Sequence, residues 1–225
     1  MRMMRPNAIA TFSAGMTAVV VLALATAWLA WTYLEALGEF RSVVVSALFV
    51  LFIYVYAIVV HRVLFLLIPL REGSIPVGHS QEYAYQVHCL FYLVLLNTLI
   101  RTRFIPVPIM RLIYQALGAR LGPNTYCSGI MYDPMFVTIG ANTIVGESAL
   151  LIPHVVEGME LAHFPIKIGN NVTIGANALV LAGTIIHDNA TVAANAVVVK
   201  GTEIKAGEIW GGTPARLISK VASAA

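Results

Sequence analysis

The stretch "LIPHVVEG" holds two side chains suited to proton transfer, His154 and Glu157. An imidazole has a pKa near neutrality, so it can take a proton from an attacking hydroxyl or amine, which typically contributes ~10²–10⁴-fold in rate. A carboxylate beside it can hold the ring tautomer and stabilise the imidazolium. We therefore predict that His154 is a general base and that Glu157 orients it. The alternative is a structural histidine that caps its loop.

The second feature is an aliphatic residue that returns every six places after this stretch. A helix repeats near 3.6 residues and a strand at 2, so neither gives six directly. Six residues can hold a short strand and a turn, and three such units close a triangular coil of about eighteen residues that is stable only when stacked. The residues on this register are Ile139, Val145, Leu151, Ile168, Ile174, Val180, Ile186, Val192, Val198 and Ile204.

Two further sets of residues support the coil. The positions four places after the aliphatic residue are small or β-branched, as a crowded corner requires, and Asn and Asp supply turn chemistry. The corner residues are Val172, Ala178, Thr184, Ala190, Ala196 and Thr202; the turn residues are Asn170, Asn171, Asn177, Asp188, Asn189 and Asn195. Ordinary β-sandwich strands do not account for this spacing.

The repeat is interrupted once. Leu151 and Ile168 are seventeen residues apart, one short of three repeats, so "PHVVEGMELAHFP" is predicted to be a loop that leaves the coil. Function is often found on such excursions from a rigid scaffold. This loop carries His154 and a second candidate, His163, which either binds substrate or packs within the loop. His187 is expected to point outward at a coil edge.

The N-terminal part of the chain has the composition of membrane segments. Hydrophobic residues make up 59% of the sequence and charged residues 11%. Residues 8–34 and 42–60 contain no charge, and each is long enough to cross a bilayer as a helix. The first run is longer than the apolar core of a signal peptide, so we expect a retained anchor. The alternative is a pair of buried helices.

The positive-inside rule orients this hairpin. Basic residues precede the first run and follow the second, whereas the connection contains Glu35, Glu39 and a single Arg41. Both termini are therefore predicted to be cytoplasmic, with a short outer turn. We expect a multi-pass protein of the cell membrane in contact with lipid, and no basic patch with interleaved aromatic residues indicates a nucleic-acid partner.

The middle of the chain is ambiguous. After a Gly- and Pro-containing loop, residues 82–100 form an apolar stretch whose core is short for a span, so it could span, re-enter the membrane or lie on its surface. A further helix is expected between Pro108 and Gly118. The predicted domains are a transmembrane hairpin at 1–71, a helical linker at 72–120 and the coil at 121–218.

The C-terminal half resembles the hexapeptide-repeat acyltransferases. The likeness lies in "IKIGNNVTIGANALVLAGTIIHDNATVAANAVVVKG" and in the closing "GGTPARLI". The segment from "GARLG" through "YDP" to His154, Glu157 and Ile168-Gly169 is similar to a membrane-associated branch that includes terminal domains of poly-amino-acid and peptide synthetases. The resemblance implies an all-β, left-handed parallel β-helix, preceded here by the transmembrane α-helices.

The resemblance also implies the reaction and its partners. The family most often transfers an acyl group, so an acetyltransferase that uses acetyl-CoA is expected, with a sugar, lipid-linked or amine acceptor, in a homotrimer whose catalytic domain is cytoplasmic. It implies that backbone groups near Ala176 and Ala194, eighteen residues apart, touch the pantetheine arm. Lys200 and Arg216 would meet the nucleotide phosphates, and their alternative is solvated surface charge.

Two other classes of function stay open from the sequence. One is a non-catalytic trimeric scaffold. The other is a metal-dependent hydratase like the carbonic anhydrases of this fold, which needs three histidines with two of them five apart. His154, His163 and His187 are nine and twenty-four residues apart, so we predict no metal site.

Overall fold

The computed structural model describes residues 3–102 and 105–220, which form two compact units. One is helical and contains residues 3–70 and 77–102. The other is a β-helical unit that contains residues 71–76 and 105–220. The chain therefore leaves the helical unit for six residues, 71–76, and then returns to it. The predicted linker 72–120 is divided between the two units.

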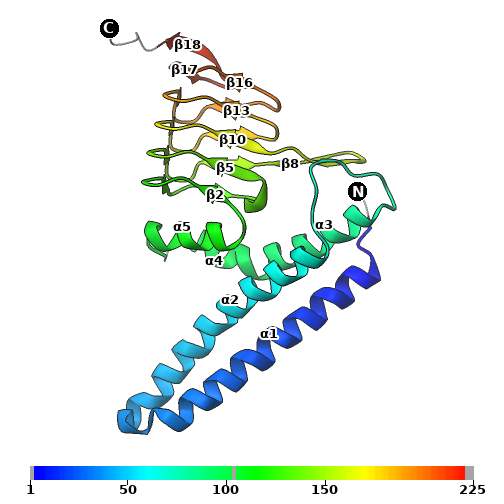
Figure 1. Ribbon diagram of the computed structural model, residues 1–225, viewed down its shortest axis with the longest axis vertical. Helices are drawn as coiled ribbons and strands as arrows, with labels where there is room; N and C mark the ends of the chain where they lie inside the picture. The colour runs from blue at the N-terminus through cyan, green and yellow to red at the C-terminus, as the bar shows by residue number, and fades with distance from the viewer. Residues whose placement is uncertain (1–2, 103–104, 221–225) are drawn as a thin grey trace. The chain divides into compact units, whose positions relative to one another are not determined.

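Three sheets form the coils of the β-helical unit, and the chain visits them in turn. Their strands are parallel, except that the last strand of the second sheet pairs antiparallel with its neighbour. Strands stacked in each sheet come from successive coils, as Figure 1 shows for β2, β5, β10, β13 and β16. That first sheet contains β2 (Arg120–Leu121), β5 (Val137–Ile139), β10 (Ile166–Ile168), β13 (Ile185–Ile186) and β16 (Glu203–Ile204). The second contains β3 (Tyr126–Cys127), β6 (Ile144–Val145), β11 (Thr173–Ile174), β14 (Thr191–Val192), β17 (Glu208–Gly211) and β18 (Arg216–Lys220). The third contains β4 (Ile130–Met131), β7 (Leu150–Ile152), β12 (Leu179–Leu181) and β15 (Val197–Val198).

The six-residue register forms the core of these coils. Ile168 pairs with Ile186, and Ile174 pairs with Val192, so partners are eighteen residues apart, as the repeat predicts. All ten aliphatic residues of the register are buried. Burying one such side chain stabilises the fold by on the order of 1.5–3 kcal/mol. The aliphatic residue recurs every six places because each coil position that faces the core must be filled by an apolar side chain. The β-helix is confirmed for the residues that carry the repeat.

Asparagine makes the corners, as predicted. Asn171, Asn177, Asn189 and Asn195 have φ between 54° and 60°, the left-handed conformation that asparagine tolerates better than most residues. Asn170 and Asp188 do something else, because their side chains accept backbone N–H groups of the coil before. Asn170 accepts from Ala141 at 2.8 Å, and Asp188 accepts from Asn170 at 2.7 Å.

The predicted loop after Leu151 is a β-hairpin. Strands β8 (His154–Glu157) and β9 (Glu160–His163) pair antiparallel, and β1 (Gly73–Ser74) adds to the outer side of β9. Figure 1 shows β8 running out of the stack of coils. Because of this excursion, Ile168 pairs with Ile139, 29 residues earlier, before the eighteen-residue spacing resumes.

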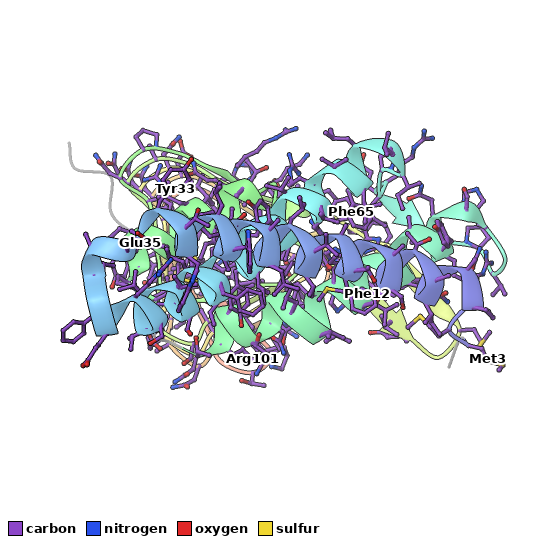
Figure 2. All side chains as sticks on the ribbon, turned by 90° about the horizontal axis from the view of Figure 1, so that it is seen from below. Met3, Phe12, Tyr33, Glu35, Phe65 and Arg101 are labelled. Carbon is purple, nitrogen blue, oxygen red and sulfur yellow. The ribbon has the colours of Figure 1, made fainter. Side chains whose placement is uncertain are left out.

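Long helices dominate the helical unit. Helices α1 (Pro6–Tyr33) and α2 (Arg41–Leu67) are joined by the 3-10 segment η1 (Glu35–Phe40). Figure 2 shows α1 along its length, from the Met3 end to Tyr33 and Glu35. A third helical stretch is formed by α3 (Ser80–Phe91), the π-helical segment η2 (Tyr92–Leu96) and α4 (Asn97–Arg101). All three stretches are long and apolar enough to cross a membrane.

The three stretches share an apolar core with one polar pair inside it. Ala8, Phe65, Val87 and Phe91 pack together, one or more from each of α1, α2 and α3. Against Phe65 of this core lie the buried rings of His61 and His88, which join α2 to α3 with Nε2 and Nδ1 3.0 Å apart. A hydrogen bond of this kind joins helices because each ring satisfies a buried polar atom of the other.

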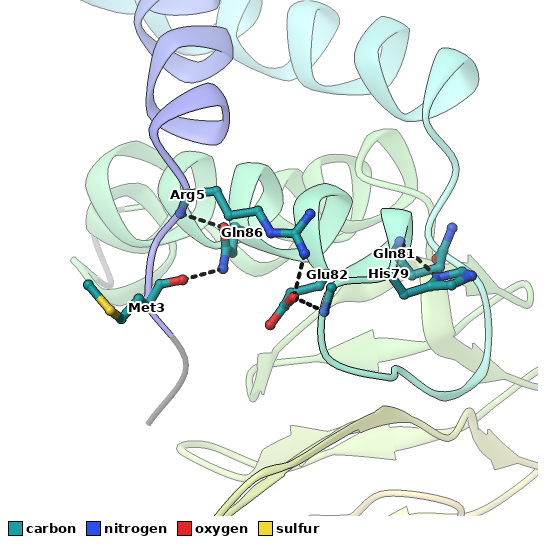
Figure 3. A network of polar contacts seen from close by, with 7 residues as sticks. Met3, Arg5, His79, Gln81, Glu82 and Gln86 are labelled. Carbon is teal, nitrogen blue, oxygen red and sulfur yellow. Dashed lines mark hydrogen bonds and ion pairs between the residues drawn. The ribbon is translucent and has the colours of Figure 1, made fainter.

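A polar network fixes the start of α1 to α3 (Figure 3). The Arg5 guanidinium donates to Glu82 at 2.8 Å, and the backbone N–H of Gly78 donates to the same carboxylate oxygen. Gln86 accepts from the Arg5 N–H and donates to the Met3 carbonyl, both at 2.9 Å. Three of these hydrogen bonds hold the chain segment before α1, and the fourth orients the Glu82 carboxylate.

One short helix belongs to the β-helical unit. Helix α5 (Val107–Ala116) has Pro108 in its first turn, and Gly118 follows its end with φ of 114°, so both predicted boundaries are confirmed. Its Tyr114 is buried and donates a hydrogen bond to the Gly129 carbonyl at 3.0 Å. The helix is thereby attached to the first coil.

Candidate active site

His154 forms an ion pair with a carboxylate of the coil. Its Nδ1 lies 2.5 Å from Oδ2 of Asp133, and the side chains are 24% and 5% exposed, respectively. With Nδ1 donating to the carboxylate, Nε2 is left as the basic nitrogen of a neutral ring. The imidazole is therefore partly accessible to solvent, whereas the carboxylate is buried.

The local fold explains why Asp133 is available. It follows β4 and precedes the 3-10 segment η3 (Pro134–Phe136), with φ of 44° and ψ of 64°. Asp visits this left-handed region more readily than most residues, and Pro134 begins the next turn. The chain thus turns sharply at Asp133, whose buried carboxylate is directed to the hairpin.

Asp133 decides the protonation behaviour of the ring. Burial lowers the pKa of His154, but the hydrogen bond to Asp133 and its negative charge outweigh burial, so the pKa is raised above its ordinary value. The ring is therefore a stronger base than a free imidazole. The Tyr132 ring stands edge-on to the imidazole, with 5.9 Å between the ring centroids.

Glu157 does not orient the imidazole in this structure. Its carboxylate accepts from Nζ of Lys200 at 2.6 Å, and both side chains are exposed. The reason is the geometry of β8, because residues three apart on a strand point to opposite faces. The carboxylate that occupies the predicted position is Asp133, which lies 21 residues earlier in the chain.

Sequence analysis missed Asp133, although a signal was present. Continued backward from Ile139, the six-residue register reaches position 133, then Cys127 and Leu121. Cys127 and Leu121 are buried in coil strands, whereas position 133 holds a carboxylate where the repeat requires an aliphatic residue. A charged residue on the core register is costly to bury unless it is paired, so the sequence at this position indicates a partner from outside the repeat.

His163 lies directly across the hairpin from His154 and is fully buried. Its ring stacks on Phe136, with centroids 4.7 Å apart and planes 21° apart. A ring buried in this way does not reach a substrate without a movement of the hairpin. His187 is exposed at a coil edge, as expected, with Nε2 2.8 Å from Glu203.

The four residues predicted to bind the donor lie on the coils. Ala176 and Ala194 belong to successive coils, since the Asn195 N–H donates to the Ala176 carbonyl at 2.9 Å. Both lie on accessible corners of the stack. Arg216 is exposed at the start of β18. Lys200 is engaged with Glu157, so an anion would have to compete for it.

No cluster of metal ligands accompanies these residues. Within residues 3–102 and 105–220, no three His, Cys, Asp or Glu side chains come together as a metal site would require. The closest pair of candidate groups is His154 with Asp133.

The coil sequence matches a known family. Residues 165–200 fit the family described as bacterial transferase hexapeptide (six repeats). The resemblance to hexapeptide-repeat acyltransferases is thereby confirmed, and the structures solved for this fold imply that the coils are left-handed.

One curated relative comes from the branch named by the resemblance. The chain is 28% identical over 108 residues to delta-poly-L-ornithine synthetase of Acinetobacter baumannii. The match covers 47% of this chain and 8% of the synthetase, so the chain corresponds to a small part of that protein.

Solved structures similar to this chain include acetyltransferases. A hexapeptide-repeat acetyltransferase of Vibrio cholerae, in complex with acetyl-CoA, has a TM-score of 0.50 and 21% identity, covering 65% of this chain and 92% of its own. A maltose O-acetyltransferase of Clostridium difficile has a TM-score of 0.44 and 18% identity, covering 68% and 95%. At these identities the likeness concerns the fold.

Proposed function

We propose that this protein is a membrane-anchored acyltransferase in which His154 is the general base and Asp133 orients it. The observation that carries the proposal is the 2.5 Å contact between His154 Nδ1 and Asp133 at the point where a hairpin leaves the coils. Hexapeptide repeats and a homologous segment in a poly-ornithine synthetase favour acyl transfer over other chemistry on this fold.

The residues act on a proton at Nε2 of His154. Nε2 takes the proton of the acceptor hydroxyl or amine as that group attacks, and the imidazolium then returns it to the departing sulfur. Asp133 stays ionised, keeps the tautomer and stabilises the imidazolium between the two transfers. Bound acetyl-CoA supplies an activated thioester, whose acyl carbon bonds to the acceptor as its bond to sulfur breaks, so no covalent nucleophile of the protein is needed.

For donor binding we propose the accessible corners at Ala176 and Ala194 and the exposed guanidinium of Arg216. Backbone groups along stacked corners suit a long pantetheine arm, and a guanidinium binds phosphate bidentately. Lys200 would bind phosphate only after releasing Glu157, an exposed pair worth about 0–1 kcal/mol, which a dianion can displace.

We also propose a homotrimer, which is usual among proteins of this fold. The third sheet presents a column of aliphatic side chains outward, and neighbours in it are in register. The column is Ile130, Leu150, Leu179 and Val197, each half-buried in the single chain. Such a column is costly to leave in water and suits contact with a second copy.

The test compares His154→Gln with His187→Gln in the full-length protein in detergent. His187 is a matched control, because it is an exposed coil histidine with a carboxylate partner of its own. Radiolabelled acetyl-CoA is offered with maltose, glucosamine, ornithine and a membrane lipid extract as acceptors. We expect transfer to at least one of them, lowered ~10²–10⁴-fold by His154→Gln and within about twofold for His187→Gln.

Binding of acetyl-CoA, measured by calorimetry, should be within about twofold in both variants, because neither side chain is proposed to hold the donor. A wild-type protein that binds no acyl-CoA would favour the scaffold interpretation and refute the proposed function. A His154→Gln variant that transfers at the wild-type rate would refute the role of His154 as the general base.

A further inference from the structure

The segment Arg71–Pro76 stands apart in the chain order. It lies between α2 and α3, yet it belongs to the β-helical unit. Its strand β1 pairs with β9, with Gly73 opposite His163 and Ser74 opposite Ala162. The Ile75 N–H then donates to the Leu161 carbonyl at 2.8 Å. A segment between two membrane-type helices therefore completes the sheet that carries His154.

The hairpin needs a third strand. A two-stranded hairpin is marginally stable in water, whereas three strands with an apolar contact can hold together. Two packing contacts attach the hairpin to the coils: Val155 and Ala162 pack with Ala182, and the buried His163 ring stacks on Phe136. Its ion pair between Glu157 and Lys200 is exposed and contributes little to stability. Strand β1 adds the third strand on the side of β9 that faces away from β8.

Within the segment 71–76, Ile75 is the residue that is buried. It is 3% exposed, whereas Val77, two residues later and beyond the strand, is 65% exposed. Gly73 has φ of 107°, which favours glycine at the position paired with His163. The pairing therefore depends on one buried anchor and one special backbone position.

Gly73, His163 and the proposed base His154 lie side by side on three adjacent strands. Gly73 is opposite His163, and His163 is opposite His154. His154 comes from the hairpin, but Asp133 comes from the coil, so a shift of the hairpin against the coil changes the distance between the two. Misplacing a catalytic group by 1 Å can cost about 10²-fold in rate.

We infer that Ile75 is a positioning residue, and that the segment Arg71–Pro76 holds the hairpin so that His154 meets Asp133. The catalytic consequence rests on the proposed function; the structural one does not. The segment is continuous with α2 before it and with α3 after it. The position of the base is thereby connected through the backbone to the helices that enter the membrane.

The test uses Ile75→Ala, Ile75→Val and the control Val77→Ala in the full-length protein in detergent. Amide hydrogen exchange is measured for peptides covering 154–163 and, as a folding control, 173–198. We expect at least tenfold faster exchange of the hairpin in Ile75→Ala, with the coils unchanged, and wild-type behaviour in Ile75→Val and Val77→Ala.

A second readout reports on the base itself. Exchange at C2 of the His154 ring, followed by mass spectrometry over pH, gives its titration without any substrate. Asp133 is hydrogen-bonded to the ring and Tyr132 stands edge-on to it, so loss of the Asp133 contact should move the midpoint toward that of a free imidazole. Unchanged hairpin exchange, or an unchanged His154 titration, in Ile75→Ala overturns the inference.

Kinetics separate this inference from the proposed function. With acetyl-CoA and whichever tested acceptor is used, Ile75→Ala should lower kcat roughly tenfold and leave the KM for acetyl-CoA within about twofold. If the wild-type protein transfers nothing, the proposed function fails, while the two exchange measurements still decide the role of Ile75. Looser hairpin exchange with an unchanged kcat would refute the positioning role.

Discussion

At the scale of single residues, the candidate site depends on one substitution within a repeat. Asp133 occupies the place of a core aliphatic residue, and Met131 fills the core in its stead by pairing with Leu151. A buried carboxylate is stable there because a partner arrives from outside the coil. The buried carboxylate of Asp133 and the imidazole of His154 therefore stabilise each other, and the six-residue repeat requires neither residue.

The charge of Asp133 gives a testable pH dependence. A general base acts only when neutral, so the rate falls as the pH drops through its pKa. Burial lowers the pKa of His154 and Asp133 raises it by more, so Asp133→Asn should move the acid limb of the pH–rate profile to lower pH. The rate of this variant on the plateau of the profile should fall at least about tenfold, because the neutral amide orients the ring and stabilises the imidazolium less well than the carboxylate.

Stability gives the second half of this prediction. A histidine whose folded pKa is raised contributes stability that is fully present below its unfolded pKa and is lost as the pH rises through the folded pKa. The melting temperature of Asp133→Asn should therefore fall further below that of wild type at pH 5 than at pH 8. An acid limb that stays in place would show that Asp133 does not set the pKa of the base.

At the scale of elements, the coils could be predicted from sequence and the hairpin could not. Each coil position is specified locally, because a buried aliphatic residue recurs every six places and Asn marks the corners. The sheet formed by β8 and β9 is completed by β1. That strand is two residues long, lies about 80 residues earlier in the chain and has no repeating pattern, so nothing in the sequence indicates the pairing. Likewise, the pairing of Glu157 with Lys200 depends on strand faces that a predicted loop does not specify.

The close stacking of coils predicts a sensitive position at Gly175. A Cβ added there would lie 2.3 Å from the Ala194 nitrogen and 2.6 Å from the Ala193 carbonyl carbon of the next coil, and backbone cannot move away cheaply. Gly175→Ala should lower the free energy of unfolding by about 1–3 kcal/mol. Thermal melting in detergent measures it, with Thr173→Ala on the exposed side of the same strand as control. Equal melting of the two variants would mean that the coils are not so tightly stacked.

At the scale of the whole molecule, β1 restricts how the chain can meet a membrane. Segment 71–76 precedes the third helical stretch, and the coils follow it, yet β1 and β9 pair within one compact unit. Paired strands lie on the same side of a bilayer. Both ends of the stretch Ser80–Arg101 are therefore expected on the same side of the bilayer. We predict that it does not span, although it is long and apolar enough to do so. We predict that α1 and α2 each cross once, and the positive-inside rule then places the segment and the coils in the cytoplasm.

Labelling of single cysteines tests this topology. In a chain whose Cys89 and Cys127 are replaced by serine and alanine, Glu72→Cys, Thr138→Cys and Glu39→Cys place one exposed thiol before the third stretch, on the coils and in the turn between α1 and α2. A membrane-impermeant maleimide should reach the first two in inside-out vesicles and the third in intact cells, because only α1 and α2 cross. Labelling of Glu72→Cys and Thr138→Cys from opposite sides would require Ser80–Arg101 to span, and strand β1 could then not pair with the hairpin that carries His154.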